Sequence, residues 1–176
     1  MTIRCNRRTP SLVLCAGVAA AMSSAVARAG VVNAFWLNPV SGAWNVAANW
    51  STSPDFPNNG ADAYHAIIEA TGAAYTVTLN SSVTLDQLTL NSADATLSHT
   101  SGTLTVANGL MLNAGVYRLG GGTIANTVIT STGGTVSAQG ASTLTGVTLS
   151  APLSITGNAV VTVSNGLTLD NGSIQL

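Results

Sequence analysis

The chain has 176 residues and a formal net charge of −1, and only 6% of its residues are charged while 46% are hydrophobic. It contains no lysine. This composition gives no support to a nucleic-acid partner, which would need several basic side chains to neutralise phosphates, or to charge-driven binding at an anionic membrane, which needs a basic patch.

Residues 1–29 carry the three parts of a secretory signal peptide. The basic part comes first, with Arg4, Arg7 and Arg8. The apolar stretch 12–21 follows and is shorter than the roughly 20 residues that span a bilayer. The segment ends in the small residues Ala27 and Ala29 of an A-x-A site. We therefore predict export, with signal peptidase recognising Ala27 and Ala29 and cleaving before Gly30.

Two other export signals are compatible with parts of this segment. Arg7 and Arg8 form a twin arginine, and Cys15 follows an apolar run as a lipidated cysteine does. The arginine pair lacks a strong twin-arginine context, and Leu14 is bulky where a small residue is expected before a lipidated cysteine. A cleavable secretory signal is the preferred interpretation.

Cleavage after residue 29 would change the chemistry of the chain. Both cysteines and four of the five basic residues would leave, and the remaining 147 residues would keep Arg118 against six carboxylates, a net charge of −5. Disulfides, thiolate metal sites and cysteine nucleophiles are then excluded. The mature length suits one domain with a hydrophobic core.

Residues 30–74 hold most of the aromatic side chains. These are Phe35, Trp36, Trp44, Trp50, Phe56 and Tyr64. We predict that this range forms an N-terminal cap over the open apolar end of the following repeats, because large rings bury much area at about 25 cal/mol per Å². The alternative is that Trp36, Trp44 and Trp50 form a platform on which sugar rings stack.

From residue 75 onward the sequence alternates between apolar and polar residues in short runs separated by Gly, Asn and Ser, a pattern that predicts β-strands. The runs are 75–79, 83–90, 103–106, 110–112, 116–119, 143–149, 160–163, 167–169 and 173–176. Nothing in this range has helical periodicity.

An internal repeat selects the β architecture. Residues 102–119 align without gaps on residues 159–176, an offset of 57, and eight of eighteen positions are identical. This offset equals about three coils of roughly 19 residues, typical of a parallel β-helix (β-solenoid). We predict an all-β solenoid of about five rungs over residues 75–176. Because the chain stops on a strand within the pattern, we expect a C-terminal region or anchor to be missing.

Three segments resemble known bacterial surface proteins. The opening 35–44, with Ala48-Asn49-Trp50-Ser51 after it, resembles the entry segment of β-helical surface proteins. The sequences of residues 142–149 and 161–169 are similar to repeats of autotransporter passengers and PEP-CTERM-type surface proteins. The resemblance implies a β-helical fold and a passenger or adhesin role. The sequence departs from these families in that neither their C-terminal barrel nor their sorting helix is recognisable in it.

Ionisable side chains are too few and too scattered to predict chemistry. Asp86, Asp94 and Arg118 are the candidates for a polysaccharide-cleaving groove, whereas Asp55 and Asp62 fit solvated turn residues. His65 fits a half-buried cap residue and His99 a rung corner. We therefore predict a non-enzyme with no catalytic residue, metal or cofactor.

We expect a secreted or cell-surface repeat protein, a passenger, stalk or adhesin-like surface, located in the periplasm, at the cell surface or outside the cell. Its expected partners are glycans or neighbouring cell surfaces. Alternatives are a carbohydrate-active or carbohydrate-binding β-helix, and a truncated gene remnant.

Overall fold

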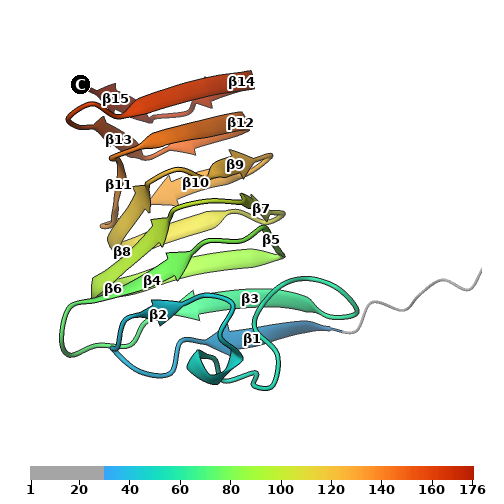
Figure 1. Ribbon diagram of the computed structural model, residues 1–176. Coiled ribbons are helices and arrows are strands. Elements are labelled where there is room, and N and C mark those ends of the chain that lie inside the picture. Colours follow the sequence, from blue (N-terminus) through green and yellow to red (C-terminus); the bar gives the residue numbers. More distant parts are fainter. Residues whose placement is uncertain (1–29) are drawn as a thin grey trace, which may run out of the picture.

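The computed structural model describes residues 30–176 as a parallel β-solenoid of about six turns (Figure 1). The predicted signal peptide, including Ala27 and Ala29, lies outside the described residues. The predicted fold class is confirmed. In the part of the chain that the structure describes, no helix is long and apolar enough to cross a membrane.

The coil has three faces, and the first is a stack of parallel strands that starts at the N-terminal end. It contains β1 (Val31–Phe35), β3 (Ala63–Ile68), the first part of β6 (Gln87–His99), the first part of β8 (Leu110–Leu119), β10 (Val128–Ser131), and the last parts of β12 (Ala141–Ser150) and β14 (Val160–Leu169). Thus β1 and β3, within the range predicted to form the cap, already belong to the stack.

The second and third faces complete each turn. The second face contains β2 (Gly42–Ala43), β4 (Tyr75–Leu79), the last parts of β6 and β8, β11 (Thr135–Ala138), β13 (Pro152–Ile155) and β15 (Ser173–Gln175). The third face contains β5 (Val83–Leu85), β7 (Thr103–Val106), β9 (Thr123–Ala125), and the first parts of β12 and β14. A short 3-10 helix, η1 (Ala47–Asn49), lies between β2 and β3.

Alternation of apolar and polar residues orients each strand. In β7, Leu104 and Val106 are fully buried while Thr103 and Thr105 face outward. Because the strands are parallel and in register, an inward side chain in one turn contacts the equivalent side chain in the next, as Leu104 does with Ile124. The core is therefore a continuous column of aliphatic side chains along the coil axis.

The repeat of 57 residues corresponds to three turns, as predicted. On the second face, successive pairings lead from Tyr117 through Val136 and Leu153 to Ile174, 57 residues further on. On the first face, the same three steps lead from Leu110 to Leu169, which adds two residues. An addition of two residues keeps every side chain on its own side of the sheet, so the inward pattern is preserved.

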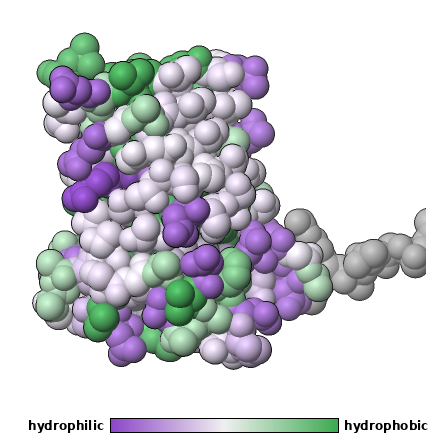
Figure 2. Space-filling model, in the orientation of Figure 1, coloured by the Kyte–Doolittle hydropathy of each residue, from purple (hydrophilic) through white to green (hydrophobic). Residues whose placement is uncertain are grey.

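The two ends of the coil differ. At the N-terminal end the core is covered by the chain between β1 and β3, which includes η1. At the other end Leu169 and Ile174 are 49% and 42% exposed. Figure 2 shows hydrophobic residues gathered at this end, over β14 and β15. The last turn therefore leaves part of its apolar interior facing solvent.

Candidate functional site

The three tryptophans form a packed cluster at the N-terminal end. The rings of Trp44 and Trp50 have centroids 4.6 Å apart, and those of Trp36 and Trp50 are 5.1 Å apart at 88°. Each indole N–H donates to a backbone oxygen: Trp44 to Pro57 at 3.0 Å, Trp50 to Trp44 at 2.7 Å and Trp36 to Val40 at 3.3 Å. Edge-to-face packing with satisfied N–H groups is typical of a structural core.

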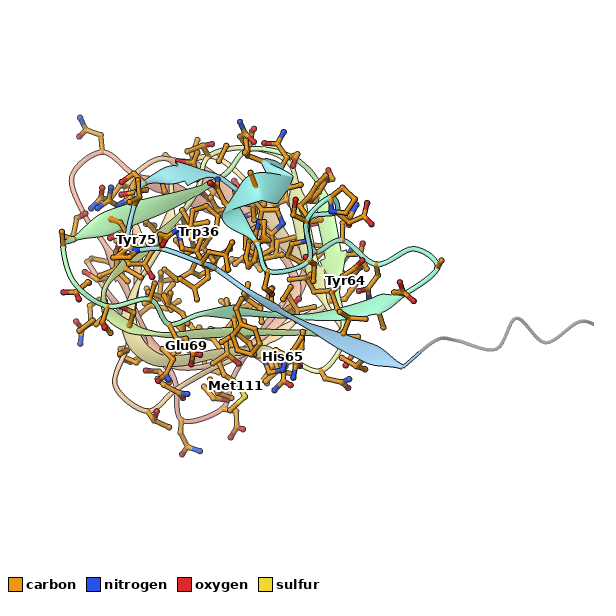
Figure 3. All side chains as sticks on the ribbon, turned by 90° about the horizontal axis from the view of Figure 1, so that it is seen from below. Trp36, Tyr64, His65, Glu69, Tyr75 and Met111 are labelled. Carbon is orange, nitrogen blue, oxygen red and sulfur yellow. The ribbon has the colours of Figure 1, made fainter. Side chains whose placement is uncertain are left out.

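Burial of these rings decides what they can contact. Trp44 and Trp50 are 0% exposed and Trp36 is 3% exposed. Viewed from the N-terminal end of the coil, Trp36 lies inside its outline while Met111 lies at its outside (Figure 3). Stacking on a sugar requires an open ring face, and none of the three indoles offers one in this structure. The cluster covers the core, which is the role of a cap.

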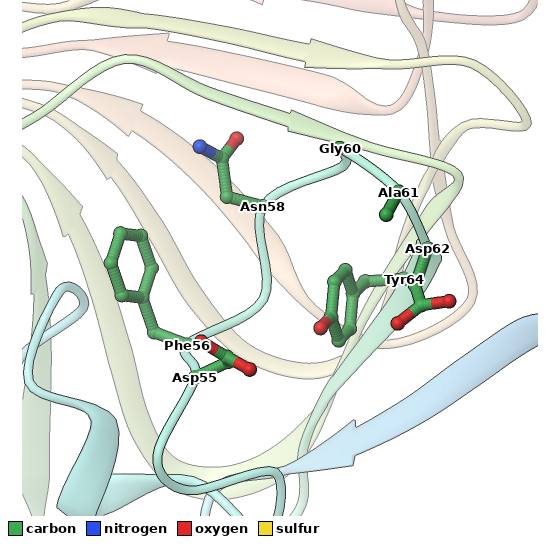
Figure 4. Close-up of a pocket in the computed structure, with 7 residues that line it drawn as sticks. All are labelled: Asp55, Phe56, Asn58, Gly60, Ala61, Asp62 and Tyr64. Atoms are coloured by element: carbon green, nitrogen blue, oxygen red, sulfur yellow. The ribbon is translucent and has the colours of Figure 1, made fainter.

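A pocket of about 330 Å³ lies at the loop whose Pro57 carbonyl accepts the hydrogen bond from Trp44. Its walls are the loop between η1 and β3 and the start of β3, and seven residues line it (Figure 4). They are Asp55, Phe56, Asn58, Gly60, Ala61, Asp62 and Tyr64. Carboxylates, an amide and two aromatic rings are therefore brought to one concave surface.

Hydrogen bonds to two strands fix the pocket loop. The Asn58 side-chain oxygen accepts from the backbone N–H of Thr84 in β5 at 2.9 Å. The Asn59 side-chain oxygen accepts from the backbone N–H of Tyr64 in β3 at 2.7 Å, and its own N–H donates to the Thr84 carbonyl at 2.7 Å. The two asparagine side chains thus accept hydrogen bonds that a neighbouring strand would otherwise accept from Tyr64 and Thr84. These bonds hold the loop against the coil.

The pKa of Tyr64 reflects the burial and the negative charge around the pocket. Burial raises the pKa of its phenol, and the negative charges of Asp55 and Asp62 raise this pKa further. The phenol therefore stays neutral and able to donate a hydrogen bond. The loop offers carboxylate acceptors for hydroxyl or amine donors, beside the rings of Phe56 and Tyr64.

Sequence reasoning interpreted Asp55 and Asp62 as solvated turn residues and did not identify the pocket. The structure brings both around one pocket together with Asn58 and Tyr64. The density of Asp, Asn and aromatic residues between positions 55 and 64 was the available signal. Spacing along the chain does not show that this loop folds back on β3 and β5.

The candidate residues for cleaving a polysaccharide lie in different parts of the coil. Asp86 follows β5 at the corner between the third and first faces, and Asp94 lies in the corner within β6, where its Oδ2 accepts from Gly72 N–H at 2.9 Å. Arg118 lies on the second face in β8. Over residues 30–176, no group of three or more His, Cys, Asp or Glu side chains is arranged to hold a metal ion.

The two histidines occupy different environments. His65 is half-buried on the first face, and its Nε2 lies 2.8 Å from Thr89 Oγ1. Burial lowers the pKa of His65, and the charge of Asp86 partly opposes this.

His99, at the end of β6, is fully buried. Its Nε2 lies 3.2 Å from the carbonyl of Gly102, and its Nδ1 lies 3.0 Å from the hydroxyl of Tyr117. A carbonyl can only accept, so Nε2 carries the proton and Nδ1 accepts from Tyr117. Burial lowers the pKa of His99 and raises that of Tyr117. The pair is thus a neutral hydrogen-bonded unit inside the coil.

Comparison of the chain with family models, curated proteins and solved structures found no match.

Proposed function

We propose that this β-solenoid is a non-enzymatic protein of the bacterial exterior, a passenger, stalk or adhesin-like surface. The observation that carries the proposal is the third face of the coil, where in-register strands place Thr and Ser outward in turn after turn. Arg118 is the single Lys or Arg of residues 30–176. A rigid rod of hydroxyl groups suits many weak contacts that add up along its length.

Two further features support this assignment. The segment 1–29 has the composition of a secretory signal, and the repeats resemble those of autotransporter passengers and PEP-CTERM-type proteins. The absence of cysteine after residue 15 frees folding outside the cytoplasm from disulfide formation.

Export is tested by expressing the full chain in a bacterial host and sequencing the N-terminus of the protein recovered outside the cytoplasm. We expect a mature N-terminus at Gly30. The variant Ala29→Arg should leave the signal attached, because signal peptidase requires a small residue there. Retention of the unprocessed wild-type chain in the cytoplasm would contradict the proposal.

Adhesion is tested with the purified chain coupled to beads and offered to immobilised glycans and to whole cells. We expect retention that increases steeply with the density of coupled protein, because single contacts are weak and their number sets the avidity. Beads that show no retention at any density would contradict an adhesive role while leaving export untouched.

The pocket at Asp55, Phe56, Asp62 and Tyr64 favours a second candidate, carbohydrate binding at the N-terminal end. Its size and its mixture of rings and acceptors suit one small polar ligand. Titration of monosaccharides into the chain should quench or shift tyrosine signals in the wild type and not in Asp55→Asn/Asp62→Asn. Equal responses in both proteins would remove the pocket from consideration.

A further inference from the structure

The third face of the coil, named here the threonine face, carries two straight columns of small side chains, all of them hydroxyl-bearing except Ala125. Strand pairing places Thr103, Thr123, Thr143 and Thr162 side by side in one column. The second column, two residues along each strand, contains Thr84, Thr105, Ala125, Thr145 and Ser164. The columns cover β5, β7, β9, β12 and β14.

These side chains point away from the core. The residues between the two columns are Leu104, Ile124 and Leu144, which are at most 1% exposed, and Val163 in the last turn. Since successive side chains of a strand point to opposite sides, Thr103, Thr105 and their equivalents must face solvent. The threonine face is therefore an outer surface of the coil along its whole length.

Sheet geometry makes this surface a regular two-dimensional array. Neighbouring strands lie about 4.8 Å apart, and residues i and i+2 lie about 6.6 Å apart along a strand. Each threonine puts one hydroxyl and one methyl at a grid point, while Ser164 supplies a hydroxyl alone and Ala125 a methyl alone. Because threonine is branched at Cβ and its χ1 angle is restricted, these groups are held in place before any partner arrives.

The threonine face contains only small polar and aliphatic residues. The third-face segments of residues 83–85, 103–106, 123–125, 141–145 and 160–164 contain no charged and no aromatic residue. Hydroxyls without charges are poor ligands for ions, and a surface without rings has no platform for stacking sugars. On the other two faces the outward positions are interrupted by His65, Met111, Arg118 and Pro152.

We infer that the threonine face binds ice. Water oxygens in the planes of an ice crystal repeat at distances comparable to both spacings of the array, so water held at the hydroxyls would already have nearly the arrangement of the crystal. Bridging waters are enthalpically nearly as good as direct hydrogen bonds. The methyl groups between the hydroxyls neither donate nor accept hydrogen bonds, so they do not draw these waters into other positions. This inference does not depend on adhesion to cells or on the pocket at Tyr64.

The test is the freezing behaviour of a solution of the purified chain, observed on single ice crystals in a nanolitre osmometer. We expect a gap between the freezing and melting temperatures and faceted crystals, because protein bound to a crystal plane blocks its growth. Rounded crystals that grow at the melting temperature, in the presence of folded protein, would overturn the inference.

A pair of matched variants assigns any such activity to the face. Thr143→Tyr places a large ring in the middle of the array and should abolish most of the gap. Thr135→Tyr makes the same change at an exposed position of β11 on the second face and should leave the gap unchanged. Equal activity in the two variants would overturn the assignment.

Two further measurements keep the test decisive. If the circular dichroism of Thr143→Tyr shows a loss of β-structure, Thr105→Lys repeats the test in the other column and two turns away, with the same expected loss. Sedimentation with crystalline cellulose or chitin separates the alternative partner. A chain that sediments with these solids and leaves ice growth unchanged would show that the array recognises a polysaccharide, and would overturn the inference.

Discussion

His99 is a fully buried imidazole whose hydrogen bonds to Tyr117 and Gly102 suit the neutral ring. Its pKa in the folded chain is lowered by burial, whereas the unfolded chain has the ordinary value of about 6.5. Below that value the unfolded state therefore binds more protons than the folded state. The free energy of unfolding should be at its full value above about pH 6.5 and should fall as the pH is lowered, until the lowered pKa is passed.

Urea unfolding at about pH 7.5 and about pH 5 measures this effect, with a lower midpoint expected at the acid pH. The pKa of His65 is lowered too, so the variant His65→Gln is the control. Its unfolding should keep most of the pH dependence, because His99 is the more deeply buried of the two rings. A dependence that disappears in His65→Gln would assign the effect to His65 instead.

Trp50 is the centre of the tryptophan cluster, since it contacts both Trp36 and Trp44. Trp50→Ala should lower the free energy of unfolding by about 3–5 kcal/mol, the usual cost of removing a large buried ring. Chemical denaturation followed by circular dichroism measures the loss. A cost below about 1 kcal/mol would show that the cluster does not cover the core.

At the residue scale, the sequence indicates which side chains are buried, but it does not indicate which residues of other turns they contact. The burial of Trp44 and Trp50 follows from the need to cover an apolar end. The fixed tautomer of His99 does not follow, because its partner Tyr117 lies in the next turn. The pocket around Tyr64 was missed for the same reason, since its loop is held by β5.

Most residues with a positive φ are glycines, although Asn126, Asn165 and Asn171 also adopt one. Gly115, in the corner of β8, has φ +82°, and a Cβ there would collide with the carbonyl oxygens of Ser92 and Ala95 in the turn below. Gly157, after β13, has φ +64°, but a Cβ there would meet no atom within 4 Å. A substitution at Gly157 would therefore introduce backbone strain alone, whereas one at Gly115 would add a steric clash with the neighbouring turn.

Gly115→Ala should therefore cost clearly more stability than Gly157→Ala. Positive φ alone costs alanine about 1 kcal/mol, and a clash with fixed backbone atoms adds to this. Thermal unfolding of the two variants against wild type gives the comparison. Equal losses would mean that the corners of neighbouring turns are not in contact.

At the scale of elements, period-2 runs located most strands. The run 75–79 became β4 and the run 103–106 became β7 with the same bounds. The short strands β9, β10, β11 and β13 were not singled out, because three or four residues between glycines give little periodicity. β1 and β3 lie within the aromatic range 30–74, where the large rings indicate a cap and the sequence pattern does not show that the same residues also form paired strands.

At the scale of the whole molecule, the offset of 57 residues carried the prediction of architecture. It required stacked coils, and the structure has them. The offset could not give the small change of register between faces, because the two residues added on the first face leave the alternation intact. The threonine face needs the in-register stacking of turns, so fold and inferred partner depend on the same pairing.

A disulfide introduced between neighbouring turns tests this pairing most directly. The double variant Thr123→Cys/Thr143→Cys, made with Cys5→Ser and Cys15→Ser so that no other thiol remains, places two cysteines at directly paired positions of β9 and β12. Paired residues on adjacent strands are close enough for a disulfide, whereas strands two turns apart are separated by about 9.6 Å, which is beyond its reach. The solenoid predicts ready oxidation of this pair and much slower oxidation of Thr123→Cys/Ser164→Cys, whose positions lie two turns apart. Failure of the first pair to close under mild oxidation, or equal closure of both, would contradict the stacked parallel coil.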